Sequence, residues 1–519
     1  MSGHINLYRK LIDLLEKEKL ERRGYQLWII NSIIKAKRDG KNVIVELDAG
    51  MGKRVISYLI SRIFADEGVL IITPSRASVW DMYIYFKKTS GSNDWFGTIM
   101  GGVSKRIKTW SLKNRRVIIS TPISLARILE KYPDLAEGFN TIIINEVDKV
   151  LRRAPRYEQI YKNQKPNIGS ATERDSSSML VYPWNILKRR LPKDSCWIGM
   201  SGTLRDEHYV FSRDGIEIKK ELETLANVLF PKSALVIITM DKLIERTDAR
   251  DYILRNLTII SPIPVFDSKV KILVDCISME MDQVIDRIKE LYGRIFPDEI
   301  TPLRTREKIQ RTIAVLSSNN PLKIKFLRLA LARRHILANT PDVYRKFLSK
   351  PLFRKIVERY AGLNINEIIP DKSSKIQKII EIVKKWAELG QNIIIITSFV
   401  KTAIRMWRKL KEKSIANIYM LTGKTYNKRA ILEKFRKNRP SVLILTPVAE
   451  RDLDFPEASI VIIHDIISTV KSMYQRIKRA RRSNVLILYY SDTFEERKVS
   501  ILISRMIKRY PWSIRIRGS

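Results

Sequence analysis

The sequence is 519 residues long and carries 96 Lys and Arg against 55 Asp and Glu, a formal net charge of +41. A charge of this size favours a polyanionic partner, because a positive field attracts nucleic acid and speeds its encounter with the protein. An ordinary basic protein with solvated lysines is the alternative explanation. Hydrophobic residues make up 45% of the chain, enough for sizeable cores, and the length predicts about three domains.

Membrane and secreted proteins do not fit this sequence. Its longest apolar runs, such as 393–396, are far shorter than the roughly 20 residues of a membrane-spanning helix. The N-terminus shows no secretory leader. The two cysteines, Cys196 and Cys276, lie in apolar segments without metal-ligand spacing. We therefore expect a cytoplasmic protein with reduced cysteines, no membrane contact and no metal site built from cysteine.

The first part of the chain alternates short apolar runs with helical patterns. The expected strands are 43–45, 69–72, 117–119, 142–144 and 197–200. Continuous apolar strands between helices are typical of a parallel sheet that is covered on both faces. The sequence therefore predicts an α/β fold, in which ligands bind at the carboxyl ends of the strands.

The last part of the chain repeats this pattern, and a different segment separates the two. The expected strands of the second sheet are 393–396, 442–445, 460–463 and 485–488. Between the sheets, apolar residues from 277 to 291 recur at helical spacing, and 301–360 holds 15 Lys or Arg against 3 Asp or Glu. We predict a first α/β domain at 1–260, a basic helical insertion at 261–368 and a second α/β domain at 369–519.

A phosphate-binding loop is expected between the first strand and the helix that follows it. Gly50 and Gly52 let main-chain N–H groups approach phosphate oxygens, and Lys53 reaches the terminal phosphates. An ordinary glycine turn is the alternative. About 90 residues further on, a strand ends at 145–148, where Glu146 is positioned to activate water. The alternative there is an acidic helix start.

The order of these segments resembles superfamily 2 helicases, and most closely the archaeal Hef and Fanconi-anaemia M helicases, over nearly the whole chain. The resemblance implies two RecA-like motor domains, a thumb-like helical insertion and ATP as cofactor. In 23–26 it assigns the adenine contact to Gln26. In 73–76 and 121–122 it implies contacts to the nucleic-acid backbone from Ser75, Arg76 and Thr121.

The later motifs extend the resemblance into the second sheet. Residues 201–203 stand where the family has Ser-Ala-Thr. Segments 397–399 and 446–456 are similar to motifs IV and V, and segment 475–482 is similar to motif VI. The resemblance implies nucleic-acid contacts at Thr397 and Thr446 and a nucleotide contact at Asp454. It also implies catalytic roles for three residues of the last motif, which are Gln475, Arg479 and Arg482.

Four residues depart from the family pattern. Arg54 and Asn145 stand where the family has Thr or Ser and Asp, the two positions that normally hold magnesium. Asp452 and Lys478 stand where it has glycine. The resemblance therefore makes Mg²⁺ doubtful while ATP binding is retained, with the Arg54 guanidinium able to neutralise phosphate oxygens instead. We predict impaired ATP hydrolysis, as in a pseudo-enzyme.

The helical insertion favours DNA, because the archaeal relatives use one to engage branched DNA. We therefore expect a helicase-like protein that binds forked or branched DNA in repair or replication, with a separate nuclease subunit as a further partner. One alternative is an active ATP-dependent DNA helicase or translocase with an unusual metal site at Asp148 or Glu146. The other is a scaffold for a protein partner. The segment Glu496-Arg497-Lys498 resembles a nuclease signature, but we interpret it as a solvated helix face.

Overall fold

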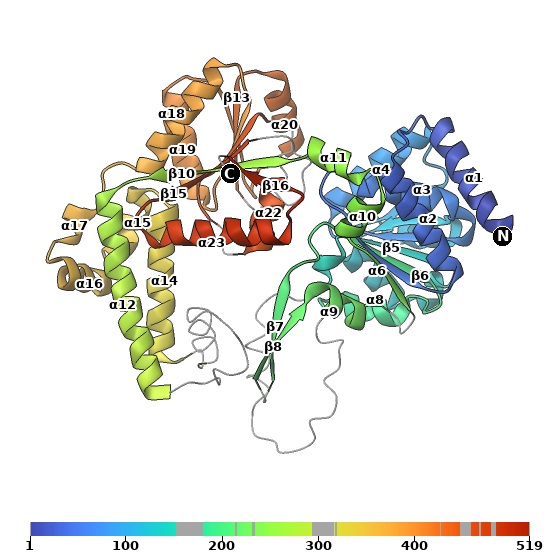
Figure 1. Cartoon of the computed structure of the whole chain (residues 1–519), viewed down its shortest axis with the longest axis horizontal. Coiled ribbons are helices and arrows are strands. Elements are labelled where there is room, and N and C mark those ends of the chain that lie inside the picture. Colours follow the sequence, from blue (N-terminus) through green and yellow to red (C-terminus); the bar gives the residue numbers. More distant parts are fainter. Residues whose placement is uncertain are drawn as a thin grey trace. The chain divides into compact units, whose positions relative to one another are not determined.

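The computed structural model describes ten stretches of the chain: 2–151, 180–212, 215–230, 234–292, 316, 319–425, 427–446, 458–466, 469–478 and 484–517. Leaving aside the β7–β8 pair (Glu207–Ser212 and Gly215–Lys220), the chain divides between Arg255 and Asn256 into two units, called unit 1 and unit 2 below. Each unit is built on its own sheet, with helices on both faces (Figure 1).

Unit 1 holds a seven-stranded sheet in the order β3-β4-β2-β5-β6-β1-β9, and all its paired strands are parallel. Its strands are β1 (Asn42–Glu46), β2 (Val69–Ile72), β3 (Phe96–Ile99), β4 (Val117–Ser120), β5 (Thr141–Asn145), β6 (Cys196–Ser201) and β9 (Leu235–Ile238). The five predicted strands are confirmed. The sequence missed β3 and β9, which lie at the two edges of the sheet.

The helices of unit 1 lie on both faces of this sheet (Figure 1). They are α1 (Ser2–Lys17), α2 (Gly24–Arg38), α3 (Lys53–Ile63), α4 (Arg76–Ser90), α5 (Lys105–Asn114), α6 (Pro122–Leu129), α8 (Trp184–Arg190), α9 (Glu221–Val228), α10 (Met240–Arg246) and α11 (Ala249–Arg255). Alternate strand residues such as Ile142 and Ile144 pack into one core cluster with Leu125 and Trp197, as the two-residue repeat of a strand requires.

Unit 2 holds a second parallel sheet of seven strands, in the order β12-β13-β11-β14-β15-β10-β16. Its strands are β10 (Thr258–Val265), β11 (Ile393–Ile396), β12 (Asn417–Leu421), β13 (Ser441–Leu445), β14 (Ile460–Ile463), β15 (Asn484–Tyr490) and β16 (Ile514–Ile516). The four predicted strands are confirmed. The sequence missed β10 because it contains Pro262 and Pro264, which argue against a strand inside a sheet.

Helices surround the second sheet and extend from it on one side. They are α12 (Ser268–Tyr292), α14 (Pro321–Ala338), α15 (Pro341–Leu348), α16 (Pro351–Ala361), α17 (Ile365–Ile368), α18 (Ser374–Glu388), α19 (Val400–Glu412), α20 (Lys428–Lys437), α22 (Val470–Lys478) and α23 (Phe494–Arg509). We call α12 and α14–α17 the helical body. The predicted boundary at 260/261 falls inside β10, and the three-domain division stays a prediction.

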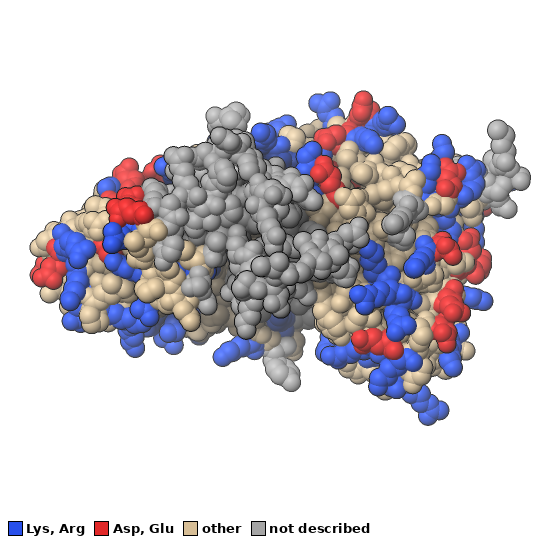
Figure 2. Space-filling view, turned by 90° about the horizontal axis from the view of Figure 1, so that it is seen from below, with Lys and Arg blue, Asp and Glu red and all other residues tan. Residues whose placement is uncertain are grey.

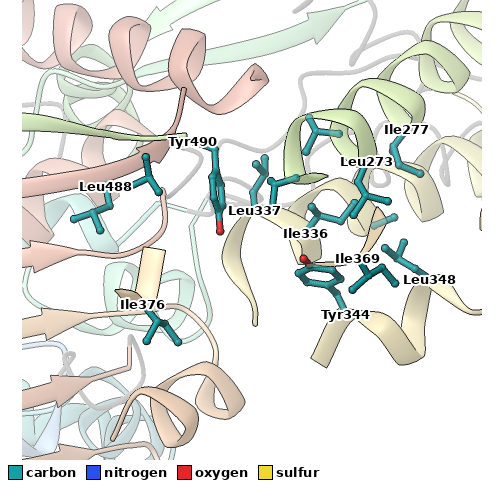
Figure 3. Packing of buried hydrophobic residues seen from close by; sticks show 14 of the residues in the cluster. Leu273, Ile277, Ile336, Leu337, Tyr344, Leu348, Ile369, Ile376, Leu488 and Tyr490 are labelled. Atoms are coloured by element: carbon teal, nitrogen blue, oxygen red, sulfur yellow. The ribbon is translucent and has the colours of Figure 1, made fainter. Parts of the chain in front are cut away.

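The helical body shares a hydrophobic core with the second sheet. Leu273 and Tyr344 of the helical body belong to the same buried cluster as Ile376 of α18 and Leu488 of β15 (Figure 3). Burial of apolar surface is the main stabilising term in folding, so we expect the helical body and the sheet to unfold together. None of the described helices is long and apolar enough to cross a membrane.

A buried acid joins three helices of the helical body. Glu280 on α12 is 2% exposed, and its carboxylate contacts Lys325 of α14 at 2.5 Å and Arg359 of α16 at 3.3 Å. The Tyr360 hydroxyl donates to the same carboxylate at 3.0 Å. Burial opposes the charged form, but the hydrogen bonds from Lys325 and Tyr360 outweigh it and hold the pKa of Glu280 below its ordinary value.

Candidate nucleotide and nucleic-acid sites

The predicted phosphate loop lies where a phosphate-binding loop requires it, between β1 and the first turn of α3. Gly50 and Gly52 both adopt positive φ, at 85° and 81°, a conformation that favours glycine. A Cβ at Gly52 would collide with the Nε2 atom of Gln26. The loop thus has a conformation that requires glycine, and it leads into the main-chain N–H groups at the start of α3. Main-chain N–H groups at the start of a helix favour an anion.

Lys53 folds back onto its own loop. Its Nζ atom donates to the main-chain oxygen of Leu47 at 2.6 Å and to that of Asp48 at 3.3 Å. A Cβ at Gly202 would lie 3.0 Å from the Leu47 oxygen and 3.2 Å from Lys53 Nζ. The glycine between Ser201 and Thr203 thus gives the loop and its lysine the space that an alanine side chain would take.

The predicted adenine-reading residue packs against the same loop. Gln26 is 3% exposed and its Nε2 atom donates to the Met51 oxygen at 3.2 Å, while the Tyr25 hydroxyl donates to that oxygen at 2.9 Å. Asp248 accepts from the main-chain N–H groups of Gly24 and Tyr25 at 2.9 and 2.6 Å and so fixes the start of α2. The sequence missed Asp248, because no local pattern signals a cap that lies more than 220 residues away.

The end of β5 places Asn145 and Glu146 beside different neighbours. The Asn145 Oδ1 atom accepts from Ser57 Oγ at 3.3 Å, and its Nδ2 atom contacts Met82 Sδ at 3.4 Å. Glu146 has a φ of 55° and forms an ion pair with Lys149. A left-handed residue other than glycine is uncommon, so the chain turns sharply here and leaves the Glu146 side chain 44% exposed.

Asp148 connects the ends of β5 and β6. Its carboxylate is 1% exposed and accepts from Ser201 Oγ at 2.6 Å and from Thr203 Oγ1 at 3.3 Å. This pairing joins the segment that holds Glu146 to the predicted Ser-Gly-Thr motif. A buried carboxylate held by two hydroxyl donors is satisfied without a metal.

Arg54, at the first turn of α3, lies next to α4. Its guanidinium is 5.8 Å from the centre of the Tyr85 ring. Burial raises the pKa of Tyr85, and the Arg54 charge opposes that shift. In the described part of the chain, no group of three or more His, Cys, Asp or Glu side chains could hold a metal ion.

The predicted nucleic-acid residues of unit 1 meet at one edge of its sheet, because β3, β4 and β2 are neighbours. Ser75 Oγ accepts from the N–H of Ser78 and caps α4. The Arg76 guanidinium lies beside Gly101, where a Cβ would collide with it. The N–H of Thr121 donates to the Ile99 oxygen at 3.0 Å.

Two further cations, which the sequence did not single out, lie close to Arg76. Burial lowers the pKa of Lys108, and the nearby charges of Arg76 and Arg127 lower it further. Mutual repulsion of this kind marks a surface that favours anions. Lys and Arg side chains are also spread over the faces of both units that Figure 2 shows, with fewer acids between them.

In unit 2, Thr397 follows β11 and Thr446 follows β13, its neighbour in the sheet. Both are buried, at 0% and 2% exposed, and neither hydroxyl has a hydrogen-bond partner among the residues that the structure describes. The N–H of Thr397 donates to the Leu445 oxygen at 3.0 Å. Buried hydroxyls usually have a partner, and the role of these two residues in binding nucleic acid stays a prediction.

The structure describes only some of the residues in the two segments that are similar to motifs V and VI, 446–456 and 475–482. Gln475 lies on α22, whereas Asp454, Arg479 and Arg482 fall outside the described residues. Lys478 is 5% exposed, and its Nζ atom donates to the main-chain oxygen of Asn256 at 2.9 Å. The lysine that replaces a family glycine therefore holds the segment that leads into β10.

Two parallel sheets and a phosphate loop define a nucleotide-binding α/β protein, and family comparisons identify its class. Residues 23–209 match the DEAD/DEAH box helicase family, and residues 374–484 match the helicase conserved C-terminal domain. Residues 23–209 and 374–484 therefore form the two RecA-like domains typical of superfamily 2 helicases, a class of proteins that binds ATP.

Individual relatives match shorter stretches. The chain is 26% identical over 181 residues to the pre-mRNA-splicing ATP-dependent RNA helicase PRP28 of Cryptococcus neoformans. This match covers 32% of this chain and 24% of that protein. It is also 28% identical over 134 residues to the DEAD-box ATP-dependent RNA helicase 36 of Arabidopsis thaliana, and this match covers 24% of this chain and 27% of that protein. The matches thus span about a quarter of each relative.

A solved structure has the same fold. The helicase domain of Pyrococcus furiosus Hef matches with a TM-score of 0.57 over 92% of this chain and 98% of that domain, at 17% sequence identity. At this level of identity the match shows a common architecture and nothing about the ligand.

The sequence relatives overturn the expected partner. They are named as RNA helicases, so the predictions of forked or branched DNA, of a role in repair or replication and of a nuclease subunit are wrong. The alternative of an active DNA helicase falls with them. The error has a physical cause: basic helices contact phosphates, which DNA and RNA share, so the charge of the insertion does not distinguish the two.

Proposed function

We propose that this chain binds RNA as a superfamily 2 helicase, holds ATP at the loop of unit 1 and hydrolyses it slowly. The RNA part of this proposal rests on sequence relatives that are named as ATP-dependent RNA helicases. The net charge of +41 supports it, as do Arg76, Lys108 and Arg127 beside the strand ends of unit 1.

Within this proposal the loop of unit 1 holds the nucleotide. The N–H groups of the loop at Gly50 and Gly52 bind phosphate oxygens, and Lys53 moves from its two main-chain acceptors to the terminal phosphates. Gln26 reads adenine and Glu146 orients water. The remaining roles fall to Asp454, Gln475, Arg479 and Arg482, which carry over from the family motifs.

Slow hydrolysis rests on the two substituted magnesium positions. Bound Mg²⁺ supplies Lewis-acid charge at the transferred phosphate, but here Asn145 offers a neutral amide where a hard cation needs a carboxylate. Arg54 adds a positive charge that opposes a divalent ion by roughly 1–4 kcal/mol at about 4 Å, depending on screening. Because each 1.36 kcal/mol changes a rate tenfold, we expect turnover about 100-fold or more below that of a site with both ligands.

Binding measurements test whether the chain prefers RNA to DNA. Fluorescence anisotropy of single-stranded RNA and DNA of equal length, with and without ATP, is expected to show tighter RNA binding with a steep salt dependence. Preference for DNA, or an affinity that is independent of salt, would contradict the RNA assignment. Arg76→Glu tests the strand-end edge of unit 1, with the exposed Arg354→Glu of α16 as the matched control.

A further inference from the structure

A cluster of cations lies in unit 2 where the helical body meets the sheet. Arg333 and Arg334 come from the last turns of α14, Lys401 from the first turn of α19, and Lys498 from the second turn of α23. We call these four residues the junction cluster. The cluster lies near the end of β11, because Phe399, three residues after that strand, contacts Arg334 and His335 of α14.

Aromatic rings hold the two guanidinium groups in place. The Arg333 Cζ atom lies 3.9 Å from the centre of the Phe494 ring, and the Arg334 Cζ atom lies 5.3 Å from that of Phe399. Arg333 also donates to Ser278 Oγ at 3.2 Å. Guanidinium groups stacked on rings lose little further freedom when they bind an oxyanion.

The amine of Lys498 lies in an unfavourable environment. It was expected on a solvated helix face, but it is only partly exposed, and no described residue forms a hydrogen bond or ion pair with it. Burial lowers the pKa of its amine, and Arg334 and Arg333 lower it further. An ammonium group beside two guanidinium groups is repelled by each of them, and an anion between them removes this repulsion.

The acids near Lys498 are already engaged by other groups. Glu495 accepts from Lys375 Nζ with both oxygens, at 2.9 and 2.7 Å, and from the N–H of Tyr490 at 2.8 Å. Asp465 accepts from the N–H of Ser398 at 2.7 Å and lies 3.7 Å from the His464 ring. Their charges attract Lys498, but they do not bond to it.

We propose that the junction cluster binds the phosphate backbone of single-stranded RNA and extends the RNA path from the strand end at Thr397 onto the helical body. The charge, the fixed guanidinium planes and the ammonium group of Lys498 suit phosphodiester oxygens. The cluster also lies close in the chain to the end of β11, where Thr397 stands, so the proposed path continues from that strand end. This inference rests on the proposed function, because it assumes that the chain binds RNA.

The test measures the affinity of the full chain for a short labelled oligouridine over a range of KCl concentrations. Removal of one phosphate contact to a single strand lowers the slope of log K against log salt by about 0.7, so Arg334→Ala with Lys498→Met is expected to lower it by about 1.4. At about 0.1 M salt the same relation gives about 5-fold weaker binding per phosphate, or about 25-fold for the double variant.

A matched control removes the same two charges elsewhere in unit 2. Arg354→Ala with Lys384→Met changes exposed residues of α16 and α18, and we expect its salt slope to stay at the wild-type value. Lys498→Arg keeps the charge and is expected to retain the slope, which a merely structural role for the lysine does not predict. Thermal unfolding of each variant checks that it folds.

The outcomes distinguish this inference from the proposed function. If the wild-type chain binds RNA and Arg76→Glu weakens it, but the Arg334/Lys498 variant behaves like the control, the junction site is wrong and the proposed function stands. If the wild-type chain shows no salt-dependent RNA binding, the proposed function fails, and the junction site fails with it.

Discussion

Lys375 is a fully buried cation of unit 2 and allows the sharpest stability prediction. Its side chain is 0% exposed, and its Nζ atom donates to both oxygens of Glu495 and to the main-chain oxygens of Leu337 and His464, at 3.1 and 3.2 Å. It also lies 4.6 Å from the centre of the Tyr490 ring. One amine thus connects α18 to α14, β14 and α23.

Lys375→Met removes the amine and keeps most of the volume. Glu495, 4% exposed, is left as a buried charge that still accepts from the N–H of Tyr490, and two carbonyls are left without the amine. Breaking a buried ion pair on one side costs about 3–5 kcal/mol. In a unit of more than about 150 residues, this corresponds to a fall in Tm of about 6–20 °C.

A double-mutant cycle measures the pair itself. Urea and thermal unfolding are followed by circular dichroism for Lys375→Met, Glu495→Gln and the double variant. We expect the double variant to be at least about 2 kcal/mol more stable than the sum of the single changes predicts, because neither charge is then buried alone. A cost below about 1 kcal/mol for Lys375→Met, with additive changes, would refute this reasoning.

Three further predictions concern Glu280, Gly202 and Cys196. Glu280→Gln is expected to lower the free energy of unfolding at pH 7 by about 2 kcal/mol. The pKa of Glu280 is depressed in the folded chain, so its stabilisation is complete above the unfolded value of about 4.3 and is lost as pH falls through the folded value; urea titrations at several pH values should show the two proteins converging in acid. Gly202→Ala places a methyl group 3.2 Å from Lys53 Nζ, and we expect about 1–3 kcal/mol of destabilisation together with weaker binding of a fluorescent ATP analogue; unchanged nucleotide affinity would contradict this contact. Burial raises the pKa of the Cys196 thiol to about 11, so this thiol should react with a disulfide reagent at neutral pH only after unfolding, and rapid labelling of the folded chain would show that it is accessible.

The sequence predicted the features that depend on short-range pattern. Nine buried strands were found from their apolar runs, and the loop at Gly50 and Gly52 from its place between a strand and a helix. Features that depend on distant contacts could not be found. The cap at Asp248, the pairing of Asp148 with Ser201 and the environment of Lys498 all join residues from separate elements.

The choice between DNA and RNA failed for a different reason. Positive charge and helical periodicity report on phosphate contacts, and these carry no information about the sugar. The 2′-hydroxyl that separates the two polymers is read by individual side chains at close range, and no composition or spacing reveals it. The names of the relatives, which are RNA helicases, are the reason why we propose RNA.

The rate of RNA-stimulated ATP hydrolysis tests the nucleotide site most directly. It is measured on the wild-type chain and on the variant that restores both family ligands, Arg54→Thr with Asn145→Asp. We expect wild type to bind ATP and to turn over about 100-fold or more slowly than the restored variant. Wild-type turnover of about one per second or faster, within the ordinary range of enzymes, would contradict slow hydrolysis and return magnesium to the site.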